Sequence, residues 1–138
     1  MSGCIVGWAH SKFGKHEGRD IEALIVEVTQ AALADAGVSA AAIDTVYLGT
    51  MNGGFVRQEF PASLVFQADP GFRFKPATRV EDACATGSAA IHQGLNAIAA
   101  GRARAAAIAL SPWWIAAEPV AQASSTRVAG LKRNPGSA

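Results

Sequence analysis

The sequence has little cysteine, little net charge and no long apolar run. Its two cysteines, Cys4 and Cys84, are too few for a disulfide framework and give no metal-ligand spacing. The formal net charge is +1, so we expect no nucleic-acid or membrane-surface partner. No apolar run is long enough to span a bilayer, and no secretory signal is visible at the N-terminus. We therefore expect a protein of the reducing cytoplasm.

What is present is a globular composition with a regular pattern. Half of the 138 residues are hydrophobic, which suits one domain with a core of its own. Short apolar runs predict strands at 4–9, 45–50, 77–80 and 105–110. Helical spacing of apolar residues predicts helices at 20–37, 58–67 and 88–100. This alternation implies an α/β fold of order β-α-β-α-β-α-β, a mostly parallel sheet with helices on both faces.

Several single residues have structural interpretations. Asp20 is a typical N-cap and Gly37 a typical end for the first helix. Cys4 is expected to be a small core residue, because cysteines outside disulfides pack as hydrophobes. The helix at 88–100 is apolar nearly all round and should be buried centrally. Its His92 lies about 12 Å along the axis from Cys84, so we expect it to pack rather than to act as a base.

Three further features have structural or solvent-exposed interpretations. The glycine-rich stretch 51–55 lacks the Lys-Ser/Thr of a P-loop and is expected to be a turn beside a site or interface. The aromatic-basic alternation at 72–75 is expected to be a partly exposed connector rather than a phosphate contact. His10 and His16 lack metal-ligand partners and are expected to be solvated loop residues.

The stretch 80–90 reads Val-Glu-Asp-Ala-Cys-Ala-Thr-Gly-Ser-Ala-Ala and joins a predicted strand to a predicted helix. Cys84 therefore lies where backbone N–H groups lack intrahelical partners and the helix dipole is positive. Both effects favour the thiolate, which is a good acyl acceptor, and neighbouring N–H groups would hold an acyl oxygen. Cys84 is the candidate nucleophile; the alternative is a buried, inert thiol.

This stretch resembles the nucleophile segment of thiolases (acetyl-CoA acetyltransferases). It is closest to the sterol-carrier-protein type and to thiolase-like proteins, in which Cys-Ala-Thr-Gly-Ser is common. The resemblance also covers 4–14, the helix from Asp20 and 47–49, and it runs to about Leu110. It implies that 1–110 is the core of a thiolase N-terminal half, an expectation that agrees with the predicted order of strands and helices.

The resemblance also implies a function. It implies an acyl-CoA acyltransferase in which Cys84 forms an acyl-enzyme thioester, during thiolysis of a 3-ketoacyl-CoA or condensation to one. No bound cofactor is implied, because the coenzyme A thioester is itself the substrate. Acyl-CoA or coenzyme A is then the partner, in lipid metabolism. A homo-oligomer is implied as well, because thiolases resemble one another in dimerising through the sheet of this half.

The pattern changes after Leu110. Ser-Pro-Trp-Trp at 111–114 interrupts the apolar strand, and 111–138 is expected to be an irregular tail with a coil composition at its end. One hypothesis is a frameshift, since two GTG codons read one base out of register give Trp-Trp; reading the downstream DNA in all frames tests it. Thiolases resemble one another in a Gly-His-Pro histidine and a Cys-x-Gly cysteine in their second half. Neither motif occurs in this chain, so only Cys84 is assigned.

Two alternatives stay open. The chain is a non-catalytic fragment or dimerisation module, or it is a ketoacyl synthase-like condensing enzyme that uses carrier-protein thioesters. Ketoacyl synthases favour Cys-Ser-Ser or Cys-Ala-Gly, so Cys-Ala-Thr-Gly-Ser favours the thiolase branch. The acyl chain length, the direction of the reaction and the activity of this chain alone are not predicted.

Overall fold

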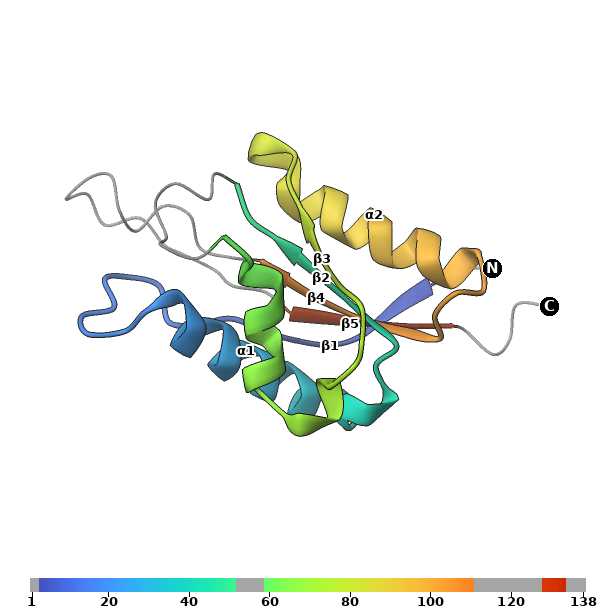
Figure 1. Cartoon of the computed structure of the whole chain (residues 1–138), viewed down its shortest axis with the longest axis horizontal. Helices are drawn as coiled ribbons and strands as arrows, with labels where there is room; N and C mark the ends of the chain where they lie inside the picture. Colours follow the sequence, from blue (N-terminus) through green and yellow to red (C-terminus); the bar gives the residue numbers. More distant parts are fainter. Residues whose placement is uncertain (1–2, 52–58, 111–127, 134–138) are drawn as a thin grey trace.

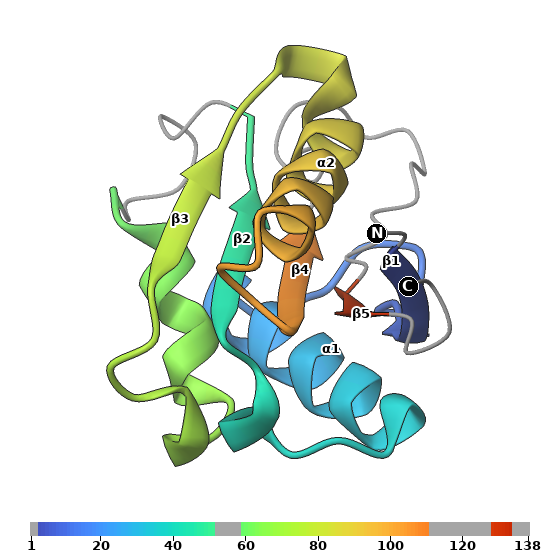
Figure 2. The same cartoon turned by 90° about the vertical axis from the view of Figure 1, so that its right-hand side faces the viewer.

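One five-stranded sheet with helices on both faces organises the chain (Figures 1 and 2). The computed structural model describes residues 3–51, 59–110 and 128–133. The strands are β1 Gly3–Ala9, β2 Thr45–Gly49, β3 Ala77–Val80, β4 Ala105–Leu110 and β5 Val128–Arg133. Their order across the sheet is β1-β5-β4-β2-β3.

Most strands run in one direction. Strand β2 pairs parallel with both β3 and β4, whereas β5 pairs antiparallel with β4 and with β1. Strands β1 to β4 therefore point the same way and β5 alone runs against them. Parallel neighbours need a crossover, and the helical segments between the strands supply it. The predicted α/β class, with a mostly parallel sheet, is confirmed.

Strand β5 lies inside the segment that was expected to be irregular. Residues 131–133, which were expected to begin a coil, are part of this strand, because Val128–Arg133 fills the place between β1 and β4. Its six residues carry little apolar pattern, so pairing on both sides, rather than local sequence, makes them a strand. The boundary at residue 110 stays a prediction, and 111–127 and 134–138 lie outside the described residues.

Helix α1, Ile21–Ala36, begins and ends where the sequence predicts. The Asp20 carboxylate accepts a hydrogen bond from the Ala23 N–H at 2.8 Å. Gly37 has a φ of 62°, and its N–H donates to the Ala34 carbonyl at 3.1 Å. Glycine adopts this left-handed conformation easily, because glycine has no Cβ.

The larger core lies between α1 and the sheet. Ile25, Val28, Val46 and Leu48 are fully buried there. The predicted helix at 58–67 contributes to this core as a 3₁₀ helix, η3 Pro61–Gln67, with Pro61 in its first turn. A segment of seven residues forms few cooperative α-helical hydrogen bonds, and short helical segments are often 3₁₀ helices. Two further 3₁₀ turns, η1 Ala40–Ala42 and η4 Pro70–Phe72, complete this layer.

Helix α2, Thr86–Ala99, covers the opposite face (Figure 2). Every fourth residue is buried, namely Thr86, Ala90, Gly94 and Ile98. Its outer face is exposed, so the expected central burial is wrong for this chain, and His92 is exposed rather than packed. An alanine-rich helix looks apolar on all sides, but here only one side meets another layer. Within the described ranges, no helix has the length and apolarity to cross a membrane.

Strand β1 is an edge strand and is poorly covered. Cys4 is exposed, so its assignment to the core is wrong. Ile5 and Trp8 are 57% and 56% exposed, while Gly7 is buried against the end of α1. An edge strand has a neighbour on one side only, and α1 covers one face of it. An apolar run at a sheet edge is therefore no guarantee of burial.

Asp44 ties the chain after α1 to the chain after α2. Its carboxylate accepts hydrogen bonds from the N–H groups of Arg104, at 2.7 Å, and Ala105, at 3.3 Å. The Arg104 guanidinium lies 3.5 Å from the same carboxylate. Burial alone would raise the pKa of Asp44, but these hydrogen bonds and the cation together lower it.

Candidate functional site

Cys84 lies in a short turn between β3 and α2. Strand β3 ends at Val80, the 3₁₀ turn η5 spans Ala83–Ala85, and α2 begins at Thr86. The predicted order of strand, cysteine and helix is confirmed. The Cys84 side chain is exposed, so the alternative of a buried thiol is wrong. The catalytic role of Cys84 stays a prediction at this point.

The residue before Cys84 has a strained backbone. Ala83 has a φ of 43°, in the left-handed region that costs a residue with a Cβ about 1–2 kcal/mol. Its N–H donates to the Glu81 side chain at 3.1 Å, and the Ala85 N–H donates to the Asp82 carbonyl at 2.8 Å. Strain of this kind persists only where surrounding contacts enforce it.

The Thr86 hydroxyl makes two of those contacts. It accepts a hydrogen bond from the Asp82 N–H and donates one to the Ala83 carbonyl, both at 2.8 Å. Thr86 is only 7% exposed, so water competes weakly for these bonds. Two hydrogen bonds at about 1 kcal/mol each are of the size needed to offset the strain at Ala83.

The first turn of α2 has no side-chain cap. Ala85 occupies the cap position and makes no side-chain bond to the first N–H groups of the helix, of which the Thr86 N–H donates to the Ala83 carbonyl. Such N–H groups attract an anion or a polarised carbonyl oxygen. The exposed carboxylates of Glu81 and Asp82 oppose negative charge in the same region. The turn thus offers an exposed thiol beside N–H donors of the kind that stabilise an oxyanion.

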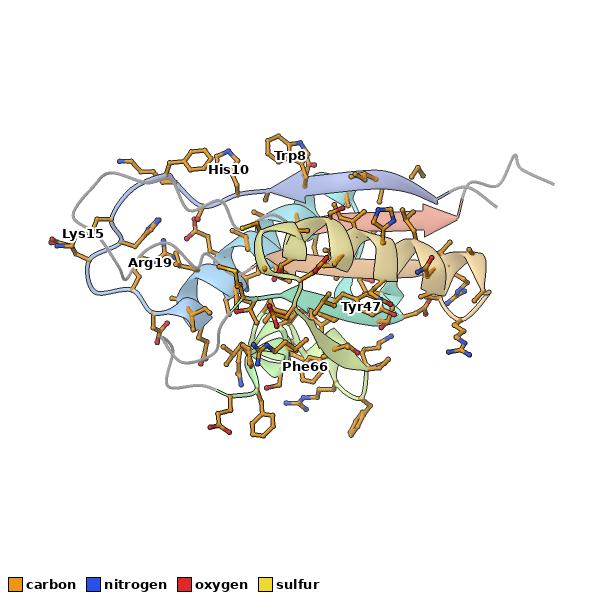
Figure 3. The ribbon with its side chains drawn as sticks, turned by 90° about the horizontal axis from the view of Figure 1, so that it is seen from above. Trp8, His10, Lys15, Arg19, Tyr47 and Phe66 are labelled. Atoms are coloured by element: carbon orange, nitrogen blue, oxygen red, sulfur yellow. The ribbon has the colours of Figure 1, made fainter. Side chains whose placement is uncertain are left out.

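None of the hydrogen bonds or ring contacts described for the histidines involves this turn. His10 is exposed and stacks between Trp8 and Phe13 at the edge of the sheet (Figure 3). His16 is partly exposed in the loop before α1, where its Nε2 is 2.7 Å from the Lys12 carbonyl oxygen. Among the described residues, no three His, Cys, Asp or Glu side chains are grouped as a metal site would need.

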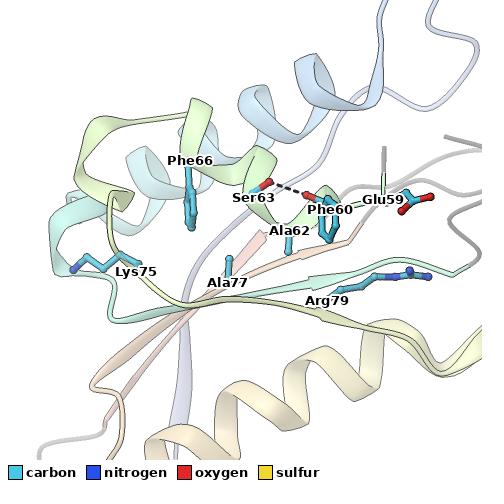
Figure 4. A pocket seen from close by; sticks show the side chains of 8 residues that line it. All are labelled: Glu59, Phe60, Ala62, Ser63, Phe66, Lys75, Ala77 and Arg79. Atoms are coloured by element: carbon cyan, nitrogen blue, oxygen red, sulfur yellow. Dashed lines mark hydrogen bonds between the residues drawn. The ribbon is translucent and has the colours of Figure 1, made fainter. Parts of the chain in front are cut away.

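A hollow of about 310 Å³ lies between η3 and β3 (Figure 4). Phe60, Phe66, Lys75 and Arg79 contribute to its lining, and Cys84 does not. We therefore leave it outside the site. The expected connector at 72–75 borders it: Phe74 is fully exposed, while Phe72 is buried. In the glycine-rich stretch 51–55, only residue 51 is described.

The sequence reasoning missed Thr86 and Ala83. One signal for Thr86 was available, because a threonine hydroxyl often bonds backbone groups three or four residues earlier. Asp82 and Ala83 stand at those spacings. No such signal exists for Ala83, because alanine rarely adopts a positive φ and nothing in the sequence around it predicts one.

Comparisons with known proteins agree with this geometry. The family model described as "Thiolase, N-terminal domain" matches residues 4–110. The acetyl-CoA acetyltransferase of Methanocaldococcus jannaschii is 42% identical over 98 residues, which make up 70% of this chain and 25% of that protein. This chain therefore spans about a quarter of the length of that curated relative.

Solved structures share the fold. A thiolase from Ascaris suum, crystallised with coenzyme A, gives a TM-score of 0.74 at 16% identity, covering 86% of this chain and 32% of that chain. The 3-oxoacyl-[acyl-carrier-protein] synthase III from Aquifex aeolicus gives 0.77 at 14% identity, covering 97% and 55%. At these identities the likeness establishes the arrangement of strands and helices, which thiolases and ketosynthases share with this chain.

Proposed function

Because the chain belongs to the thiolase family, whose N-terminal domain matches residues 4–110, we propose that it carries the nucleophile of an acyl-CoA acyltransferase. Cys84 is the residue that takes the acyl group. The observation that carries this proposal is the exposed thiol in a strained turn at an uncapped helix start. An acyl-CoA substrate is supported by a relative named as an acetyl-CoA acetyltransferase and a neighbour crystallised with coenzyme A.

The proposed reaction has two steps. The Cys84 thiolate attacks the carbonyl carbon of an acyl-CoA, and the bond from that carbon to the coenzyme A sulfur breaks. Coenzyme A leaves as a thiolate that takes up a proton, and the acyl group stays on Cys84. N–H groups near the start of α2 stabilise the oxyanion. In the second step the acyl group passes to coenzyme A, in thiolysis, or to the α-carbon of a second acyl-CoA, in condensation.

The complete reaction belongs to a longer protein in this proposal. This chain spans about a quarter of its curated relative, and the histidine that the resemblance implies as activator has no counterpart motif here. The first step is therefore the one to test on this chain. We also propose a role in lipid metabolism and a cytoplasmic location, which cell fractionation with an antibody to the chain checks.

The deciding measurement is the intact mass of the chain after incubation with acetyl-CoA. We expect an acetyl adduct that Cys84→Ala abolishes and that the matched variant Cys4→Ala retains, because both thiols are exposed but only Cys84 lies at the start of a helix. No adduct in the unaltered chain would instead support the non-catalytic fragment. Transfer from acetyl-carrier protein but not from acetyl-CoA would favour a ketoacyl synthase-like enzyme.

We propose further that the chain is a homo-oligomer paired along β3. On the opposite edge, the Trp8 N–H is occupied by the Asp35 carboxylate at 2.9 Å, and β1 has an irregular register between Ile5 and Gly7. Such features discourage pairing with another strand. Strand β3 has β2 on one side and no described strand on the other. A second copy of this chain would satisfy that open edge.

Light scattering on a sizing column tests the oligomer. The carbonyls of Pro76 and Val80 accept bonds from Val46 in β2 and from Thr50 just after it, so the alternating N–H groups of Ala77 and Arg79 face outward. Arg79→Pro removes an outward donor and should give a monomer, while Arg79→Ala should stay oligomeric. A monomeric unaltered chain, or an oligomer that survives Arg79→Pro, would contradict pairing along β3.

A further inference from the structure

The Thr86 hydroxyl bridges the two sides of the strained peptide next to Cys84. It accepts from the N–H of Asp82 on one side and donates to the carbonyl of Ala83 on the other, and Thr86 as a whole is buried. We propose that Thr86 is a positioning residue: its hydroxyl keeps the turn in the form that presents Cys84 at the start of α2. It acts on the reactivity of Cys84 without contacting the substrate.

The other hydrogen bonds of the turn are less able to do this. The Ala83 N–H bonds to Glu81, whose side chain is exposed and in competition with water. The bond from the Ala85 N–H to the Asp82 carbonyl closes the 3₁₀ turn but does not reach across Ala83 to α2. The Thr86 N–H also donates to the Ala83 carbonyl, but among the described hydrogen bonds only the Thr86 hydroxyl joins Asp82 as well as Ala83 to the helix. Without it, Ala83 can relax to a negative φ, and Cys84 then moves relative to the N–H groups of α2.

The chain offers a matched control in a second buried threonine. Thr29 on α1 is fully buried, and its Oγ1 has no hydrogen-bond partner among the described residues. Replacing threonine by valine removes one hydroxyl and keeps the branched shape at both sites. The change removes two hydrogen bonds at Thr86 and none that is described at Thr29. A difference between the two variants therefore reports the bonds and not the loss of a hydroxyl from the core.

The experiment measures alkylation of Cys84 by iodoacetamide, resolved from Cys4 by peptide mass. We expect Thr86→Val to slow Cys84 by roughly fivefold or more, the factor that corresponds to losing at least one hydrogen bond of ordinary strength. Thr86→Ser, which keeps the hydroxyl, should stay within about twofold of the unaltered chain, as should Thr29→Val. Cys4 should react at the same rate throughout, which a general loss of structure would not allow.

The outcomes separate cleanly. An unchanged Cys84 rate in Thr86→Val overturns the inference. If Thr86→Val does not fold, Thr86→Ser decides, because a slow Cys84 in that variant would place the effect in the methyl group and not in the hydroxyl. The inference rests on the proposed function, because positioning Cys84 matters only if Cys84 reacts. Its test is separate, because alkylation by iodoacetamide needs no acyl-CoA. Failure of acetyl transfer in the unaltered chain would contradict the proposed function. The alkylation rates would still decide whether Thr86 positions Cys84.

Discussion

The two long helices begin in opposite ways. Helix α1 starts at a carboxylate cap, Asp20, whose backbone is extended and whose side chain takes up the Ala23 N–H. Helix α2 starts after a strained turn, with alanine in the cap position and an exposed cysteine one residue before it. The first helix has the arrangement that stability favours. The second lacks a side-chain cap where an exposed thiol lies beside the N–H groups of the first turn.

The difference shows how a stable fold tolerates a reactive turn. An absent cap costs about 1 kcal/mol, and a positive φ at alanine costs a similar amount. Helix α2 recovers this through its buried stripe against β2 and β4 and through the two bonds of Thr86. Function is thus placed where local structure is least favourable and tertiary contacts are sufficient to hold it.

The largest effect is expected from removing the cap of α1. Asp20→Ala should lower the free energy of unfolding by about 1 kcal/mol, because the Ala23 N–H loses its acceptor. Urea unfolding followed by circular dichroism measures this. Asp20→Ser, which retains an acceptor, should recover most of the loss. Alkylation of Cys84 should not change in either variant; a slower reaction would mean that the two helix starts are not independent.

A smaller effect is expected from giving α2 a negative charge at its start. Ala85→Asp should slow iodoacetamide at Cys84 by roughly threefold, because a carboxylate in the first turn takes up the helix dipole and repels a thiolate. Ala85→Asn is the neutral control of the same shape and should react nearly as the unaltered chain does. Rates measured by peptide mass at several salt concentrations check the cause, since added salt should reduce the difference. Equal rates for the two variants would show that charge at this position has no influence.

The smallest effect is expected from replacing Asp44, which joins the segment after α1 to the segment after α2. The lowered pKa of Asp44 means that its ionised form is favoured by folding. Its contribution is therefore present above the ordinary pKa of 3.8 and is lost as the pH falls through the lower value of the folded state. Asp44→Asn should destabilise the chain by less than about 1 kcal/mol at pH 7 and flatten the acid side of the stability profile. An unchanged profile would show that the Arg104 and Ala105 contacts contribute nothing.

Much of the fold could be predicted because it depends on residues that are close together in the sequence. The apolar runs of β3 and β4 and the signals at Asp20 and Gly37 matched the observed strands and helix ends. The placement of Cys84 between a strand and a helix followed from the same reasoning. Each of these features depends on residues within one or two turns of one another, so periodicity and capping suffice to recognise them.

The sequence by itself thus determined the strands, the capped helix and the strand–cysteine–helix order. Only the tertiary structure decided that Val128–Arg133 enters the middle of the sheet, that Cys4 and His92 are exposed, and that Thr86 holds a strained Ala83. These outcomes depend on which distant segments pair and which faces find a covering layer. Burial and strain are properties of contacts between remote parts of the chain, and local patterns do not contain them.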